Sequence, residues 1–135
     1  MVAIDIKYQG QLHCTATHGP SGVRLETDAP KDNMGRGESF SPTDLVATAL
    51  GTCMLTVMGI AANKLGVNIE GATVHVEKEM VSSPIRRIAA LKVNIHVPHT
   101  LSLEHKQKLE DAAHSCPVHK SLHPDIQVPV AFTCI

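Results

Sequence analysis

Apolar and polar residues alternate in several stretches of the chain, and this period-two pattern predicts β-strands. The predicted strands cover residues 2–6, 11–17, 23–28, 74–80, 93–97 and 126–134. Turn signals lie at residues 18–22, which are rich in glycine, proline and serine, and at Pro84. Each turn separates two strands, so the pattern predicts one hairpin near the N-terminus and another in the second half of the chain.

The longest apolar segment runs from Ser41 to Gly66, and its pattern predicts a long helix. Ser41 suits the N-cap, Pro42 suits the first helical position, and Asp44 completes a capping box. Gly66 suits the position just after the last helical turn. Apolar residues cover most of the circumference of this helix, which predicts that the helix is buried.

Two shorter helices are expected in the second half of the chain. Residues 101–114 have an amphipathic pattern, and a short helical turn is predicted from Pro117 to Leu122. Strands and helices do not alternate regularly, so the sequence predicts the α+β fold class rather than a βαβ repeat. With 135 residues, the chain is expected to form one domain, residues 1–135.

The composition of the chain limits the classes of binding partner and the cellular location that we expect. A formal net charge of -1 gives no electrostatic case for binding nucleic acid or an anionic membrane. The apolar stretches are interpreted as too short or too interrupted to span a bilayer, and the N-terminus lacks the pattern of a signal peptide. These features predict a soluble cytoplasmic protein, with a core of aliphatic residues because the chain has no Trp, one Tyr and two Phe.

Four cysteines provide the candidate chemistry. In a reducing cytoplasm they are not expected to form a framework of structural disulfides, and the absence of a CxxC pair argues against a zinc ribbon or a thioredoxin motif. Cys14 lies in a predicted strand and Cys134 lies next to the C-terminus, so both are interpreted as structural. Cys53, in the long helix, and Cys116, just before Pro117, are the two candidates for reactivity.

Cys116 is predicted to be the N-cap of the short helix that begins at Pro117. The positive end of that helix, together with His119 and Lys120, predicts a lowered pKa for the Cys116 thiol. In the alternative interpretation Cys116 is only a small capping residue, and Cys53 is a small buried apolar residue. If the fold brings the two cysteines together, they make a dithiol that can cycle with a disulfide.

A zinc site is an alternative use of the same region. His114, Cys116, His119 and His123 could supply ligands, and His119 and His123 have the i, i+4 spacing of two ligands on one helix face. Pro124 follows directly, however, and the helix is short. No metal site is therefore predicted.

Two segments resemble the motifs of the OsmC/Ohr family, and in particular its OsmC-like branch. They are Ser41-Pro42-Thr43-Asp44-Leu45, which leads to Ala49-Leu50-Gly51-Thr52-Cys53, and Ser115-Cys116-Pro117-Val118-His119-Lys120-Ser121-Leu122. The order of elements agrees over about the whole chain. The resemblance implies an intertwined homodimer in which β-sheets wrap around long central helices, with active sites at the subunit interface.

The resemblance also implies a chemistry. Members of the family reduce organic hydroperoxides, and some reduce hydrogen peroxide, with two cysteines. By position, Cys53 is the residue that attacks the O–O bond, and Cys116 is the residue that resolves the sulfenic acid as a disulfide. An external dithiol reductant, lipoyl-linked in the Ohr branch, regenerates the thiols. No metal or organic cofactor is implied.

The chain departs from the family pattern near the first motif. Thr43 stands where the peroxidase branches have a glutamate that holds an arginine against the reactive thiolate. Arg24 is the first candidate for that arginine, and Arg36, paired with Glu38, is the alternative. Two other functions therefore remain open: a thiol redox sensor, and a noncatalytic protein that binds a small apolar ligand.

Overall fold

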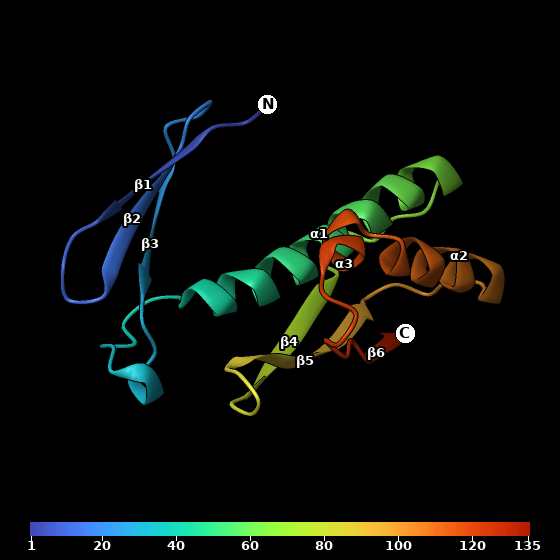
Figure 1. The fold of residues 1–135 in the computed structure, drawn as a ribbon. Coiled ribbons are helices and arrows are strands. Elements are labelled where there is room, and N and C mark those ends of the chain that lie inside the picture. The colour runs from blue at the N-terminus through green and yellow to red at the C-terminus, as the bar shows by residue number, and fades with distance from the viewer. The chain divides into compact units, whose positions relative to one another are not determined.

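A computed structural model describes all 135 residues of the chain. Its contacts divide the chain into two compact units, Met1–Val46 and Ala47–Ile135, which are described separately. The interpretation of residues 1–135 as one domain stays a prediction. The elements are β1 (Ile4–Tyr8), β2 (His13–His18), β3 (Arg24–Asp28), the 3-10 helix η1 (Lys31–Asn33), α1 (Pro42–Leu65), β4 (Thr73–Val81), β5 (Arg87–Val97), α2 (Leu103–His114), α3 (Pro117–Ser121) and β6 (Val130–Cys134) (Figure 1).

The N-terminal unit is built on an antiparallel sheet with the strand order β1-β2-β3. The pairing of β2 with β3 is the hairpin that the alternating pattern predicted. Directly paired residues point to the same face of a sheet. Ile6, Ala16 and Leu25 are paired across the three strands and make one face apolar. The opposite face is polar, because Asp5, Thr17 and Arg24 are paired in the same way.

Helix α1 begins with the predicted capping box. The Asp44 amide donates to Ser41 Oγ over 3.1 Å, and the Ser41 amide donates to Asp44 Oδ2 over 2.9 Å. These two bonds satisfy donors that the first helical turn cannot satisfy within the helix. At the other end, Gly66 has a φ of 71°, a left-handed conformation that ends the helix and favours glycine.

We expect Ser41→Ala to lower the free energy of unfolding by about 0.5–2 kcal/mol, because the buried Ser41 hydroxyl is the acceptor that closes the first turn of α1. Urea titration followed by circular dichroism measures the change. Ser82→Ala, at an exposed position outside the helices and strands, is the matched control and should stay within about 0.5 kcal/mol of wild type. Equal stability of the two variants would contradict the assigned role of the cap.

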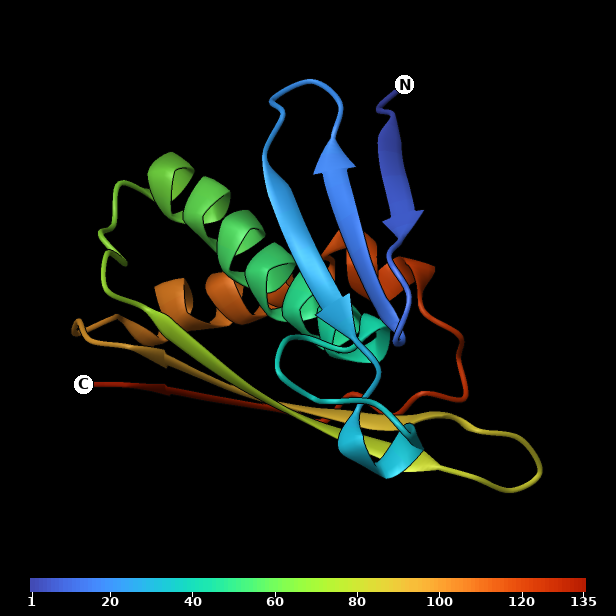
Figure 2. The same ribbon diagram turned by 90° about the vertical axis from the view of Figure 1, so that its left-hand side faces the viewer.

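The C-terminal unit has two layers, with helices over a sheet of strand order β4-β5-β6. β4 and β5 form the predicted antiparallel hairpin, and β6 joins β5 in parallel. Val93, Ile95 and Val97 of β5 are buried, while the residues between them are exposed on the opposite face. α1 and α2 lie over the same side of this sheet (Figures 1 and 2). This layered packing confirms the α+β prediction.

Helix α1 approaches β4 closely at Gly51. A Cβ atom at that position would lie 3.1 Å from Val76 Cγ2 and 3.2 Å from Val74 Cγ1, closer than side-chain carbons normally pack. The absence of a side chain at Gly51 therefore allows the close spacing between α1 and the sheet. The same spacing sets how far Cys53, two residues further along α1, lies from the sheet.

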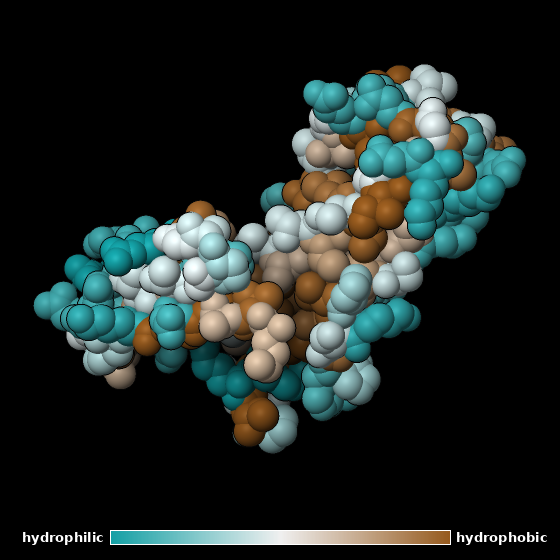
Figure 3. Space-filling model, turned by 90° about the horizontal axis from the view of Figure 1, so that it is seen from above, coloured by the Kyte–Doolittle hydropathy of each residue, from teal (hydrophilic) through white to brown (hydrophobic).

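Only one face of α1 is buried within the chain. Its buried residues recur at helical spacing and are Ala47, Leu50, Gly51, Met54, Met58 and Ala62. Thr52 and Thr56 are exposed on the other side, and Ile60 is 54% exposed. The expectation that the helix is buried all round is therefore wrong for the single chain. Hydrophobic residues are visible among polar ones on the molecular surface (Figure 3).

By length and composition alone, α1 could cross a membrane, since it has 24 residues and an 18-residue window of mean hydropathy 1.9. This corrects the expectation that the apolar stretches are too short or too interrupted. A core helix of a soluble protein meets the same two criteria. In this chain Leu50, Met54 and Met58 are fully buried by protein, as core residues are.

The remaining elements differ from the expectation mainly at their ends. Helix α2 begins after Ser102, whose Oγ accepts a hydrogen bond from the His105 amide over 3.1 Å, rather than at residue 101. Strand β6 begins at Val130 rather than at residue 126. Before it, Gln127 forms only an isolated bridge with Ala90.

Candidate functional site

The structure brings the two candidate cysteines together. Cys53 comes from the middle of α1, and Cys116 is the residue that precedes α3. Their thiols lie within hydrogen-bonding reach of each other, and this contact affects the pKa of Cys116. Both cysteines are free, so the site holds a dithiol. The sequence raised this pairing only as a possibility.

Cys116 occupies the predicted N-cap of α3. Its Sγ accepts a hydrogen bond from the His119 amide over 3.3 Å, and Pro117 takes the first helical position. The Cys116 amide in turn donates to the carbonyl of Ala113 in α2 over 3.3 Å. The end of α2 therefore holds the backbone of Cys116, and the start of α3 holds its sulfur.

Burial raises the pKa of the Cys116 thiol, because the side chain has no exposed surface and the charged thiolate would lose its water. Hydrogen bonds from the amides of His119 and Val118 act in the opposite direction but do not outweigh burial, and the adjacent Cys53 raises the pKa further. The prediction of a lowered pKa is therefore wrong. Cys116 is a neutral thiol near pH 7, whereas Cys53 is only partly buried and can be reached from outside.

His119 is also uncharged near neutral pH. Burial lowers its pKa first, and the positive charges of His114 and Lys120 lower it further. This corrects the expectation that His119 adds a positive charge beside Cys116. Its Nδ1 atom is buried and has no hydrogen-bond partner. A buried ring nitrogen without a partner is uncommon in folded proteins, and sequence analysis gave no signal of it.

The two candidate arginines lie in the N-terminal unit, whereas the cysteine pair lies in the C-terminal unit. Arg24 is exposed on β3, on the polar face of its sheet. Arg36 lies near Asp28, and its charge contributes to lowering the pKa of that carboxyl group. The pairing of Arg36 with Glu38 as an alternative to Arg24 stays a prediction. The role of Arg24 toward Cys53 stays a prediction.

A sequence model of the OsmC-like protein family matches residues 35–131, a span that contains both cysteines of the site. The chain belongs to the OsmC-like protein family. No curated protein matches the sequence.

Solved structures agree with this assignment. The structure of a protein from Psychrobacter arcticus, provisionally named as an osmotic stress induced and detoxification response protein, has 42% sequence identity and a TM-score of 0.93, over 98% of this chain and 96% of that one. Two organic hydroperoxide resistance proteins share the fold at 15% identity and a TM-score of 0.80. The match to the protein from Legionella pneumophila covers 98% of this chain and 96% of that chain. The match to the protein from Elizabethkingia anophelis covers 100% of this chain and 96% of that chain.

No group of three or more His, Cys, Asp or Glu side chains in this OsmC-like protein is arranged to hold a metal ion. The zinc set that the sequence offered, His114, Cys116, His119 and His123, is thus not assembled. Two of its members serve other contacts: Cys116 caps α3, and the His123 ring accepts a hydrogen bond from the Asp125 amide over 3.0 Å.

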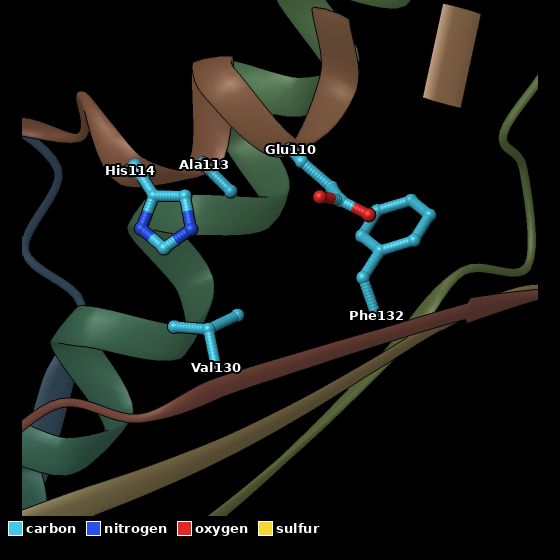
Figure 4. Close-up of a pocket in the computed structure, with 5 residues that line it drawn as sticks. All are labelled: Glu110, Ala113, His114, Val130 and Phe132. Atoms are coloured by element: carbon cyan, nitrogen blue, oxygen red, sulfur yellow. The ribbon is translucent and has the colours of Figure 1, made fainter. Parts of the chain in front are cut away.

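A small cavity lies between α2 and β6 (Figure 4). Its volume is about 130 Å³, and it is lined by Glu110, Ala113, His114, Val130 and Phe132. The ring of Phe132 and the side chain of Val130 point from the strand toward the helix. Ligand pockets for drug-sized molecules are commonly about 300–1,000 Å³. This cavity is smaller, and neither cysteine of the pair lines it.

The sequence analysis did not predict a partly buried ion pair in the N-terminal unit. His13 Nδ1 lies 2.7 Å from Asp28 Oδ1, and Glu26 Oε1 lies 3.4 Å from His13 Nε2. The hydrogen bond with Asp28 raises the pKa of His13, and the same bond lowers the pKa of Asp28. His13 and Asp28 are direct partners across β2 and β3, so a prediction of strand register would have found the pair.

This ion pair gives an expected pH dependence of stability. His13, with a raised pKa, contributes stability that is present below its usual value of 6.5 and is lost as the pH rises through the folded value. Asp28, with a lowered pKa, contributes above its usual value of 3.8 and loses that contribution as the pH falls. The pair is therefore strongest between these two values. We expect the melting temperature of wild type to decline above pH 6.5 more steeply than that of His13→Gln.

Thermal unfolding followed by circular dichroism from pH 5 to 9 measures this difference. His123→Gln is the matched control, because the His123 side chain is 68% exposed. Its pH profile should follow that of wild type. Parallel profiles of wild type and His13→Gln would contradict the assigned ion pair.

Proposed function

We propose that this OsmC-like protein is a thiol-dependent peroxidase that reduces organic hydroperoxides with Cys53 and Cys116. The observation that carries the proposal is the contact between two free thiols of unlike burial. A partly exposed Cys53 is accessible to a peroxide, while the enclosed Cys116 is placed to react only with its neighbour. Relatives named for organic hydroperoxide resistance support this substrate class.

In the first step, the Cys53 thiolate attacks one oxygen of the peroxide and the O–O bond breaks. The sulfur becomes a sulfenic acid, and the other oxygen leaves with its organic group and takes up a proton to give an alcohol. Two electrons pass from sulfur to the peroxide. This step needs a thiolate, and Arg24 remains the first candidate for stabilising it, with Arg36 as the alternative.

In the second step, the Cys116 sulfur attacks the Cys53 sulfenic acid, a disulfide forms, and water leaves. The contact between the two thiols favours this step, because the reacting sulfurs are already neighbours in the reduced protein. An external dithiol, for which a lipoyl group is the chemical candidate, then reduces the disulfide by exchange. The cycle uses no metal and no organic cofactor.

The proposal includes a homodimer in the cytoplasm. Ile60 on the outer side of α1 is 54% exposed, and Ile4, Ile6 and Tyr8 of β1 are all more than half exposed. Exposed apolar surface of this kind is favourably covered by a second subunit. Equilibrium sedimentation measures the assembly, and a dimer that dissociates when Ile60 is replaced by aspartate supports this part of the proposal.

Stopped-flow titration of the reduced protein with an organic hydroperoxide and with hydrogen peroxide tests the function. We expect fast loss of two thiols per chain, turnover with a dithiol present, and a Cys53–Cys116 crosslink in peptide mass maps. The ratio of the two rates ranks the substrates. A reversible disulfide without turnover would contradict the peroxidase function and favour a redox sensor. Failure to form the disulfide would favour a noncatalytic binding protein with the same fold.

A further inference from the structure

We infer that the thiol reductant attacks the sulfur of Cys53 in the Cys53–Cys116 disulfide, so that Cys116 is the sulfur that leaves. The inference rests on the proposed function, because it concerns the step that returns the disulfide to two thiols. It goes beyond that function because the two-cysteine cycle alone does not determine which of the two sulfurs the reductant joins.

Access to the sulfur atoms distinguishes the two residues. A thiolate attacks a disulfide sulfur from the side opposite the bond that breaks, so it needs an open approach to that sulfur. Cys116 has no exposed surface, whereas Cys53 is only partly buried. Cys53 is therefore the sulfur that a reductant arriving from solvent can reach.

The helix face around Cys53 leaves room for this approach. Ala49 and Thr56 lie about one turn before and after Cys53 on the same face of α1, and both are exposed. The side chain of Ala49 is a single methyl group, and the Thr56 hydroxyl is turned back onto the carbonyl of Thr52 over 2.7 Å. These short side chains let a small thiol lie against the helix beside the Cys53 sulfur.

The surroundings of Cys116 suit a sulfur that leaves. The His119 amide donates to Cys116 Sγ over 3.3 Å, and the Val118 amide is a second donor to the same sulfur. Hydrogen bonds of this kind favour the charged form of the acceptor, which is the form that a sulfur takes when its S–S bond breaks. The segment that closes Cys116 to attack thus supplies the donors for its departure.

One effect opposes this assignment. Burial raises the pKa of the Cys116 thiol, and a thiol of higher pKa leaves a disulfide more slowly. This effect changes the rate at which the bond breaks, but it opens no path to the Cys116 sulfur. Attack at Cys116 would require the end of α2 and the start of α3 to move away from the sulfur that they enclose, so access determines the position of attack.

The reduction then proceeds in two exchanges. The reductant thiolate forms a bond with the Cys53 sulfur, the Cys53–Cys116 bond breaks, and its electron pair goes to the Cys116 sulfur, which takes up a proton. A second thiolate of the reductant displaces Cys53 from the mixed disulfide, and two electrons have passed from the dithiol to the protein. Cys116 stays beside the mixed disulfide and can expel a reductant that has only one thiol.

Trapping the first adduct with a monothiol tests the inference without any peroxide. In a Cys14→Ser, Cys134→Ser background, diamide oxidises Cys53 and Cys116 to the disulfide, and excess 2-mercaptoethanol is then added. Samples are quenched with acid at early times, free thiols are blocked with N-ethylmaleimide, and peptide mass mapping locates the mercaptoethanol adduct. We expect at least about 10-fold more adduct on Cys53 than on Cys116, because enclosed cysteines are inert in exchange reactions.

Single-cysteine variants measure access alone, and they decide the question also where Cys116 expels the adduct too fast for trapping. In the same background, Cys116→Ser leaves only Cys53, and Cys53→Ser leaves only Cys116. We expect 5,5′-dithiobis(2-nitrobenzoate) to react with Cys53 at least about 10-fold faster than with Cys116 in the folded variants, and this difference should disappear in urea. Circular dichroism shows that both variants are folded.

The outcomes distinguish the inference from the proposed function. Adduct mainly on Cys116 or equally on both residues, or equal reagent rates in the two folded variants, would overturn attack at Cys53, whatever the protein does with peroxides. Adduct on Cys53 without any peroxide turnover would support attack at Cys53 while overturning the peroxidase function.

Discussion

Cys53→Ser is expected to abolish the proposed peroxide consumption. We expect a loss on the order of 10³-fold or more, because a serine hydroxyl is not ionised near neutral pH and cannot replace a thiolate as the nucleophile toward an O–O bond. The measurement is consumption of an organic hydroperoxide in the presence of excess dithiol. Activity equal to that of wild type would exclude Cys53 as the attacking residue.

Cys116→Ser should fail in a different way. Cys53 keeps its thiol, so one equivalent of peroxide is consumed and a sulfenic acid forms, but no neighbouring sulfur can resolve it. A single burst followed by a stall is therefore expected, with the sulfenic acid trapped by dimedone and identified on Cys53 by mass spectrometry. Cys14→Ser and Cys134→Ser are matched controls in strands and should turn over as wild type does.

The long helix and the cap of the short helix could be predicted because each depends on residues close in sequence. Ser41 and Asp44 form their capping box within one turn, and Cys116 caps α3 through an amide three residues away. Such local hydrogen bonds follow from spacing alone. The positions of both cysteines in the elements were accordingly predictable from the sequence.

The electrostatics of the site could not be predicted in the same way, because they depend on burial. The helix start beside Cys116 and the neighbouring cations suggested a lowered pKa, but enclosure of the side chain by other elements raises it instead. The same enclosure turns His119 from an expected cation into a neutral ring. The burial of a side chain depends on contacts between segments that are far apart in the chain. The periodicity of the sequence does not reveal these contacts.

Contacts at long range were missed for the same reason. The His13–Asp28 pair and the position of Arg36 beside Asp28 depend on the register of β2 against β3 and on the path of the loop that follows. The sequence analysis offered Arg36 together with Glu38, in the loop before the long helix. The charge of Arg36 also contributes to lowering the pKa of the buried Asp28 carboxyl group, a contact between segments that periodicity does not reveal.

Leu109→Ala is expected to be among the most destabilising changes in the C-terminal unit. Leu109 lies on the buried face of α2 and has no exposed surface, so its truncation removes apolar contacts and leaves a cavity. Such substitutions typically cost about 2–5 kcal/mol, a large part of the roughly 5–15 kcal/mol that stabilises a folded protein. Urea unfolding at a fixed protein concentration measures the loss.

Leu103→Ala is a matched control on the same helix, because Leu103 is 87% exposed. It should change the free energy of unfolding by no more than about 0.5 kcal/mol. The same comparison tests whether the packing of α2 affects the cysteine pair, because Ala113 at the end of α2 accepts the hydrogen bond from the Cys116 amide. If α2 holds Cys116 against Cys53, Leu109→Ala should slow disulfide formation at temperatures where the variant is still folded, and Leu103→Ala should not. Equal stability of the two variants would contradict the packing of α2 on the sheet.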